Sequence, residues 1–279
     1  MAVLDVKKKP ENELFEVIIS SRPEARVERI EALNELVSRQ QFLDRTAVFH
    51  GILAVAKFYG ISTPEGSMLS ELLSKLMRDD EVLFGILLSN LADQVKNRYF
   101  IGFAARFIRN VKPALKAQAI PSLVSVLIQQ DSIDTPADSI TDTLTMLHDE
   151  KLDDQVTSEL LPKILSANPM QVLLASRVLS KISGENALKE MLVVLDRTLA
   201  EWYGQLNNPG QLNDQIQDQV ILYLIRSPSE KVLPLIRKTV LVRRTGFLTQ
   251  MFQGFRYRPA AQMLEEIIEQ YVGILKDTT

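Results

Sequence analysis

The segment LDDQVTSELLPKIL, residues 152–165, shows the pattern that decides the fold class. Val156, Leu160 and Ile164 are apolar and follow one another at intervals of four positions. This spacing gathers them on one face of an α-helix, whereas a half-buried β-strand would need strict alternation of apolar and polar residues. The segment from Leu264 to Leu275 repeats the helical spacing, and no convincing alternating run occurs in the chain. The sequence therefore predicts an all-α protein.

Prolines and small capping residues mark where helices begin. Four pairs join a capping side chain to a proline, which suits the first helical turn because its missing N–H needs no partner there: Thr63-Pro64, Thr135-Pro136, Asn168-Pro169 and Ser227-Pro228. Gly60, Gly184 and the turn at 207–210 mark ends of helices. Together these signals predict helices near 11–20, 24–39, 42–59, 65–78, 81–95, 98–110, 112–129, 137–148, 153–167, 169–182, 186–205, 212–226, 229–242, 245–255 and 259–276.

Successive helices group into pairs of about 30 to 40 residues, the size of a helical repeat. Several second helices contain a proline, as at Pro121, Pro162 and Pro234. In this pairing and these prolines the chain resembles HEAT- and armadillo-like repeat proteins. The resemblance implies a right-handed α-solenoid of about seven helix pairs, with residues 12–279 as a single helical-repeat domain and 1–11 as a flexible N-terminal arm. A globular multi-helix bundle is the alternative.

Composition restricts the class of protein further. Of 279 residues, 46% are hydrophobic but only 6% are aromatic, so the core is built mainly from aliphatic side chains. Cysteine is absent, which excludes disulfides and thiolate metal sites and agrees with a reducing compartment. No apolar leader follows Met1 and no apolar run is long enough for a membrane span. We therefore expect a cytoplasmic protein without a membrane span.

Motifs of catalysis are missing from the sequence. There is no Gly-rich phosphate loop, no dinucleotide fingerprint, no nucleophile elbow and no His-Glu-x-x-His. His50 and His148 are the two histidines, and neither has a second histidine within two helical turns. Adjacent carboxylates such as Asp153 and Asp154 point about 100° apart on a helix, so they do not face each other as an acid and base pair. We expect a protein that is not an enzyme and needs no cofactor or metal.

Charge is the most informative functional feature, because the net charge of -3 conceals two long windows without a single acidic residue. The first runs from Gln94 to Gln130 and the second from Lys231 to Leu264. Basic and aromatic residues are interspersed in both windows, a composition suited to an anionic partner. The candidate partner-binding residues are Arg98, Arg106, Arg109, Lys112, Arg237, Arg243, Arg244, Arg256, Arg258, Phe255 and Tyr257.

Within the first window, the aromatic and the basic side chains fall on different faces of the predicted helix, which indicates different roles for them. At about 100° per residue, Tyr99, Phe100, Phe103 and Phe107 fall in one quadrant, and the three arginines occupy the neighbouring face. We expect the aromatic rings in the core and Arg98, Arg106 and Arg109 outside, for a partner or for salt bridges. In the second window the arginines at 243, 244, 256 and 258 are expected in loops between helices. Phe255 or Tyr257 would there anchor a partner or, alternatively, close the last helix pair.

These patterns favour a non-enzymatic scaffold or adaptor that binds a macromolecular partner through basic surfaces, with a protein as the favoured partner. The alternative is a nucleic-acid- or ribonucleoprotein-binding protein that uses the same arginines. Partner identity, oligomeric state and whether the two windows form one surface are not encoded in recognisable motifs.

Overall fold

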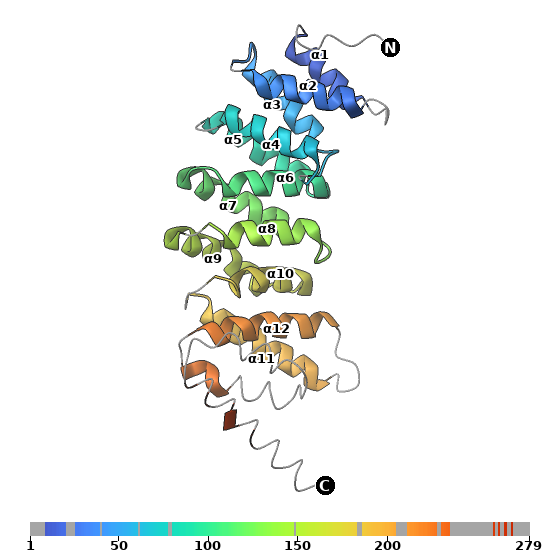
Figure 1. The fold of residues 1–279 in the computed structure, drawn as a ribbon. Helices are drawn as coiled ribbons and strands as arrows, with labels where there is room; N and C mark the ends of the chain where they lie inside the picture. Colours follow the sequence, from blue (N-terminus) through green and yellow to red (C-terminus); the bar gives the residue numbers. More distant parts are fainter. Residues whose placement is uncertain are drawn as a thin grey trace. The chain divides into compact units, whose positions relative to one another are not determined.

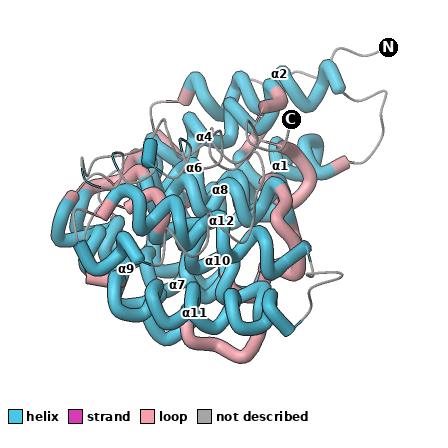
Figure 2. The backbone as a smooth tube through the Cα atoms, turned by 90° about the horizontal axis from the view of Figure 1, so that it is seen from below, coloured by secondary structure: helices cyan, strands magenta, loops and turns pink. Residues whose placement is uncertain are grey.

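The fold is all-α, as predicted. The computed structural model describes residues 9–20, 26–39, 41–60, 62–77, 80–147, 149–182, 186–204, 211–227 and 230–234, together with 259, 262, 265, 266 and 269. Within these residues there are twelve α-helices and one short 3₁₀-helix (Figure 1). Figure 2 shows only helices and loops in the same part of the chain.

The helices follow one another with short connections. In chain order they are α1 (Glu11–Ile19), α2 (Arg26–Ser38), α3 (Arg45–Val55), α4 (Pro64–Met77), α5 (Glu81–Asp93), α6 (Arg98–Arg109), α7 (Pro113–Leu127), α8 (Thr135–Thr145), α9 (Glu150–Ile164), α10 (Pro169–Leu179), α11 (Leu188–Gly204) and α12 (Gln211–Arg226), followed by η3 (Glu230–Val232). The predicted helices at 245–255 and 259–276 lie wholly or mostly outside the described residues, as does most of the one at 229–242.

The predicted caps are confirmed where proline follows Thr63 and Asn168. The Thr63 hydroxyl accepts from the Gly66 N–H at 3.1 Å, and the Asn168 side chain accepts from the Met170 N–H at 3.0 Å. The third expected cap differs by one residue. Thr135 is itself the first residue of α8, and Asp134 takes the cap position. Asp134 provides no side-chain bond to that helix, and its carboxylate accepts from the Ser132 hydroxyl.

Contacts within the chain divide it into two compact units, Met1–Leu147 and His148–Thr279. In the first unit the even-numbered helices α2, α4, α6 and α8 pack each against the next, and the odd-numbered helices α1, α3, α5 and α7 do the same (Figure 1). Neighbours in sequence, such as α7 and α8, pack across the two layers. In the second unit α10 packs against both α9 and α12, and α11 packs against α12. Each unit therefore buries its apolar stripes between successive helix pairs.

Side chains near helix ends bind the backbone of the preceding helix pair in the first unit. The Asn97 amide donates to the carbonyl of Lys57, 40 positions earlier, at 3.2 Å. The Gln130 amide donates to the carbonyl of Val95, 35 positions earlier, at 3.0 Å. These separations match the 30- to 40-residue unit expected from the sequence. The turns are thus held by polar contacts that recur with the length of one helix pair.

The N-terminal boundary differs slightly from the expected arm. The predicted arm ends at Glu11 and includes Lys9 and Pro10, whereas α1 begins at Glu11. Arg39 holds these residues in place, since its guanidinium donates to the carbonyl of Lys9 at 2.6 Å and pairs with the Glu11 carboxylate at 3.3 Å. The eight residues before Lys9 lie outside the described part of the chain.

Candidate partner-binding surface

Helix α6 carries three of the six basic residues of the first window, and both of its ends are fixed. At its start the Asn97 side chain accepts from the Phe100 N–H at 3.1 Å and caps the helix. Its apolar face is formed by Phe100, Phe103 and Phe107, which are buried as predicted. Tyr99 was expected to join them but is 38% exposed, because it stands at the edge of the stripe and its polar hydroxyl favours water.

The outer face of α6 presents Arg98, Tyr99 and Arg106 to solvent. The Arg98 guanidinium lies 4.8 Å from the centre of the Tyr99 ring and donates to its hydroxyl at 2.9 Å. Within the described residues no carboxylate pairs with the guanidinium of Arg98 or of Arg106. Eight positions on a helix span about 12 Å, so the two cations define an elongated basic stripe.

Arg109 lies at the end of the same helix but contacts α8. Its Nε donates to the Thr143 hydroxyl at 2.9 Å and its Nη2 donates to the carbonyl of Ser139 at 3.1 Å. Its Nη1 also approaches the sulfur of Met146 at 3.7 Å. The predicted external position is therefore only partly realised, and Arg109 is half-buried. A ligand would have to compete with α8 for this guanidinium.

The helices on either side of α6 differ in charge. On α4, Ser67, Ser70 and Ser74 are exposed or half-exposed, whereas α8 presents the carboxylates of Asp138 and Asp142. Like charges repel an acidic group, so α8 limits an anionic partner on one side of α6. On α4 these serines are accompanied by one exposed ion pair, Lys75 with Glu71 at 3.5 Å. The first unit thus offers a basic stripe with an acidic border along α8.

A depression of about 600 Å³ lies at the N-terminal end of the stripe. It joins Arg98 and Tyr99 to Lys57 and Lys96, and to the carboxylate of Asp93. Lys96 pairs with Asp131 at 3.9 Å, but both side chains are 88% exposed, so this ion pair contributes little stability. The depression therefore extends the positive charge beyond α6.

A larger groove of about 1100 Å³ lies at the other end, where α2, α4 and α6 terminate. Lys112 lines it, as do Arg39, Arg45 and Lys75, which come from other helix pairs. Sequence reasoning missed Arg45 and Lys75 because neither lies in an acid-free window. A sequence signal for Lys75 does exist, because it lies in the last turn of α4, where a basic side chain is near the free carbonyls of a helix end.

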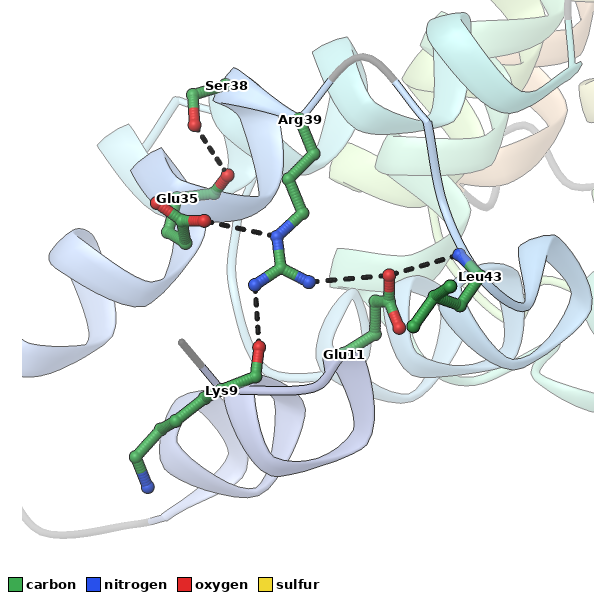
Figure 3. A network of polar contacts seen from close by, with 6 residues as sticks. All are labelled: Lys9, Glu11, Glu35, Ser38, Arg39 and Leu43. Atoms are coloured by element: carbon green, nitrogen blue, oxygen red, sulfur yellow. Dashed lines mark hydrogen bonds and ion pairs between the residues drawn. The ribbon is translucent and has the colours of Figure 1, made fainter. Parts of the chain in front are cut away.

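Arg39 also lines this groove, yet its charge is neutralised inside the fold (Figure 3). Its Nε pairs with Glu35 at 3.1 Å and its Nη1 with Glu11 at 3.3 Å. The Glu11 carboxylate also accepts from the Leu43 N–H at 3.2 Å. Arg39 therefore ties α1 to the end of α2 and to the loop that begins α3, and it is not counted among the cations offered to a ligand.

The structure brings Arg98 and Arg106 onto one face, places Lys112 at the groove and turns Arg109 towards α8. The second predicted group lies outside the described residues: Arg237, Arg243, Arg244, Arg256, Arg258, Phe255 and Tyr257.

In the described residues no group of three or more His, Asp or Glu side chains could hold a metal ion. His50 is exposed on α3.

No protein-family model matches this sequence, and comparison with curated proteins finds no match. Among the described helices, none combines the length and the hydropathy that crossing a membrane requires.

Proposed function

We propose that this chain is a non-enzymatic helical-repeat adaptor that binds a protein partner through the basic stripe of α6. The proposed repeat is HEAT- or armadillo-like. The layered packing of alternate helices in the first unit and the polar contacts at 35 and 40 positions support it. A solenoid of this kind acts by presenting an extended surface on a rigid frame.

One observation carries the proposal: Arg98 and Arg106 are exposed on one helix face with no carboxylate partner in the described residues. Arginine is favoured at interfaces because its planar guanidinium can bind a carboxylate through two parallel hydrogen bonds. Tyr99 beside Arg98 adds an aromatic surface of the kind that anchors interfaces. A rigid helix holds both groups in place, which reduces the entropy lost on binding.

A protein partner fits this surface better than nucleic acid does. Strong binding to a nucleic acid needs a track of several phosphate contacts. The stripe offers two unpaired arginines over about 12 Å of helix, and α8 borders it with Asp138 and Asp142. A protein can match such a mixed pattern of charge with carboxylates on one side and neutral or basic groups on the other.

The test is affinity capture from extract of the native cells, with and without nuclease. The variant Arg98→Glu/Arg106→Glu changes the charge by four units, and Lys151→Glu/Lys189→Glu on exposed positions of α9 and α11 is a control with the same change. We expect a nuclease-resistant protein to be lost from the α6 variant and kept by the control. Equal recovery on both variants would contradict the proposal, and loss of the captured material on nuclease treatment would favour nucleic acid.

A further inference from the structure

We infer that Met146 is an oxidation site, and that Arg109 donates a hydrogen bond to the sulfoxide oxygen formed there. This bond fastens the end of α8 to the end of α6. The inference goes beyond the proposed function and does not depend on it, because it concerns a contact inside the first unit.

Helices α6 and α8 lie side by side and run in the same direction (Figure 1). Near their middle, a Cβ built on Gly102 would lie 3.8 Å from the hydroxyl oxygen of Ser139. At their ends, the Nη1 of Arg109 lies 3.7 Å from the sulfur of Met146. Residue numbers rise together along the contact, so the C-terminal ends of the two helices are neighbours. Met146 is the residue that ends α8.

The guanidinium of Arg109 has strong acceptors on two of its three nitrogens. Its Nε donates to the Thr143 hydroxyl and its Nη2 to the carbonyl of Ser139, at 2.9 and 3.1 Å. Its Nη1 faces the sulfur of Met146, and a thioether is only a weak acceptor. Among the residues that the structure describes, Nη1 meets no oxygen acceptor. An oxygen atom on this sulfur would complete the set.

Exposure makes Met146 accessible to an oxidant. Its side chain belongs to a residue that is 45% exposed, whereas Met77 and Met191 are completely buried. Met68 and Met170 are half-buried. Oxidation of methionine follows the access of the oxidant to the sulfur. Among the methionines that the structure describes, Met146 is therefore expected to react first.

A peroxide supplies the oxygen atom. The thioether sulfur attacks one oxygen of hydrogen peroxide, the O–O bond breaks, an S–O bond forms, and the second oxygen leaves as water. The sulfur is oxidised by two electrons and the peroxide is reduced by two. Methionine sulfoxide reductases reverse the change. No cysteine competes for the peroxide, because the chain has none.

The sulfoxide oxygen suits the space beside Arg109. It extends from a sulfur that is 3.7 Å from Nη1, so a small side-chain rotation brings it to the normal distance of about 2.7 to 3.2 Å for an N–H···O bond. A bond from a charged donor is stronger than a neutral one. The new polar group lies at an exposed helix end, so it remains hydrated and avoids the cost of burial.

This contact also affects the basic surface of α6. The sulfoxide would occupy the one guanidinium nitrogen of Arg109 that has no oxygen acceptor in the described residues. Oxidation would thus bind Arg109 to α8 on all three nitrogens and leave Arg98 and Arg106 as the cations that α6 offers to a ligand.

Treatment of the full chain with hydrogen peroxide tests whether Met146 is the site. Trypsin releases residues 117–151 as one peptide, in which Met146 is the only methionine. Mass spectrometry should find sulfoxide there forming about fivefold faster or more than in the peptides that carry Met77 and Met191. Equal rates at the three positions would overturn the assignment.

Hydrogen exchange measured by mass spectrometry tests the bond to Arg109. After oxidation, the amides of α6 and α8 should exchange about twofold more slowly or less in the wild type, and reductase should restore the original rates. Met146→Leu and Arg109→Gln, each compared before and after peroxide, control for the other methionines and for the donor. Slowing in either variant, or no slowing in the wild type, would overturn the inference.

A second pair of variants avoids peroxide altogether. Met146→Gln carries an oxygen on its δ carbon, where the sulfoxide carries one on its δ sulfur, and Met146→Leu has none. Glutamine and leucine have similar helix propensity, so the comparison isolates the acceptor. The α6 and α8 amides should exchange about twofold more slowly in Met146→Gln, and this difference should vanish when Arg109→Gln is added to both. Equal exchange with Arg109 present would show that Arg109 does not bind an oxygen at this position.

Discussion

Arg109 on α6 donates from Nε to the hydroxyl of Thr143 on α8 across 2.9 Å, and Thr143 is completely buried. The same hydroxyl can donate in turn to the carbonyl of Ser139 at 2.7 Å or of Ala105 at 3.1 Å. A charged group thus satisfies a buried hydroxyl between two helices of one layer. Hydrogen bonds to charged groups are worth about 1.5 to 3 kcal/mol, more than neutral ones.

The first prediction follows from this contact. Arg109→Gln should lower the free energy of unfolding by about 1 to 3 kcal/mol, because Thr143 and the Ser139 carbonyl lose a charged donor. Arg106→Gln, on the exposed face of the same helix, should change it by less than about 0.5 kcal/mol. Urea unfolding followed by circular dichroism measures both. Equal stability of the two variants would mean that the contacts of Arg109 with α8 do not stabilise the fold.

The second prediction compares two glycines. A Cβ added at Gly51 on α3 would lie 2.6 Å from ring carbons of the buried Phe15 on α1, so the Phe15 ring or the two helices would have to shift. Gly51→Ala should therefore be destabilising by about 1 to 3 kcal/mol, as overpacking generally is. A Cβ at Gly85 on α5 meets nothing within 4 Å. Gly85→Ala should raise stability by about 0.5 to 1 kcal/mol, since alanine favours helices.

Thermal unfolding of the two alanine variants beside the wild type provides the measurement. The melting temperature should fall for Gly51→Ala and rise for Gly85→Ala. A rise in both would show that Phe15 moves aside at little cost and that the close approach of α1 and α3 is not a packing constraint.

Much of the fold could be predicted because local signals agree with the tertiary packing. Caps at Thr63 and Asn168 and the apolar periodicity of each segment locate the helices to within a few residues. The environment of the arginines could not be predicted in the same way. Helical phase places Arg109 on the outer side of α6, but whether it meets solvent or α8 depends on a helix some 30 positions later in the chain.

The groove shows a second limit of the sequence. Arg45, Lys75 and Lys112 are far apart in the chain and come together only because successive helix pairs stack. Averaging charge along the chain hides Arg45 and Lys75, because Asp44 and Glu71 accompany them. Only Lys112 lies in an acid-free window and was therefore among the predicted residues. Spatial clusters built from several repeats are invisible to any one-dimensional charge count.

The third prediction concerns the start of α6. Asn97 accepts from the Phe100 N–H and donates to the Lys57 carbonyl, so it both caps the helix and joins it to the preceding helix pair. Asn97→Ala should lower the free energy of unfolding by about 1 to 2 kcal/mol, the usual loss for an asparagine cap. Asn34→Ala, at an exposed position inside α2, should be neutral or slightly stabilising because alanine has the higher helix propensity. Chemical denaturation of both variants decides, and a neutral Asn97→Ala would refute the joining role.

The last prediction is a double-mutant cycle on Glu11 and Arg39, whose side chains are only 8% and 18% exposed (Figure 3). Arg39→Met leaves the carboxylates of Glu11 and Glu35 without their shared cation, so it should lower the free energy of unfolding by about 3 to 5 kcal/mol. Glu11→Gln keeps Glu35 as a partner for Arg39 and should lower it less, by about 1 to 3 kcal/mol. The double variant should be more stable than the sum of the two losses implies, with a coupling of about 0.5 to 3 kcal/mol.

The control is Glu13→Gln, which changes the exposed pair with Lys9 and should alter the free energy of unfolding by less than about 1 kcal/mol. Strict additivity of the two losses would show that Arg39 and Glu11 act independently. The segment before α1 would then be held only by the bond from Arg39 to the Lys9 carbonyl.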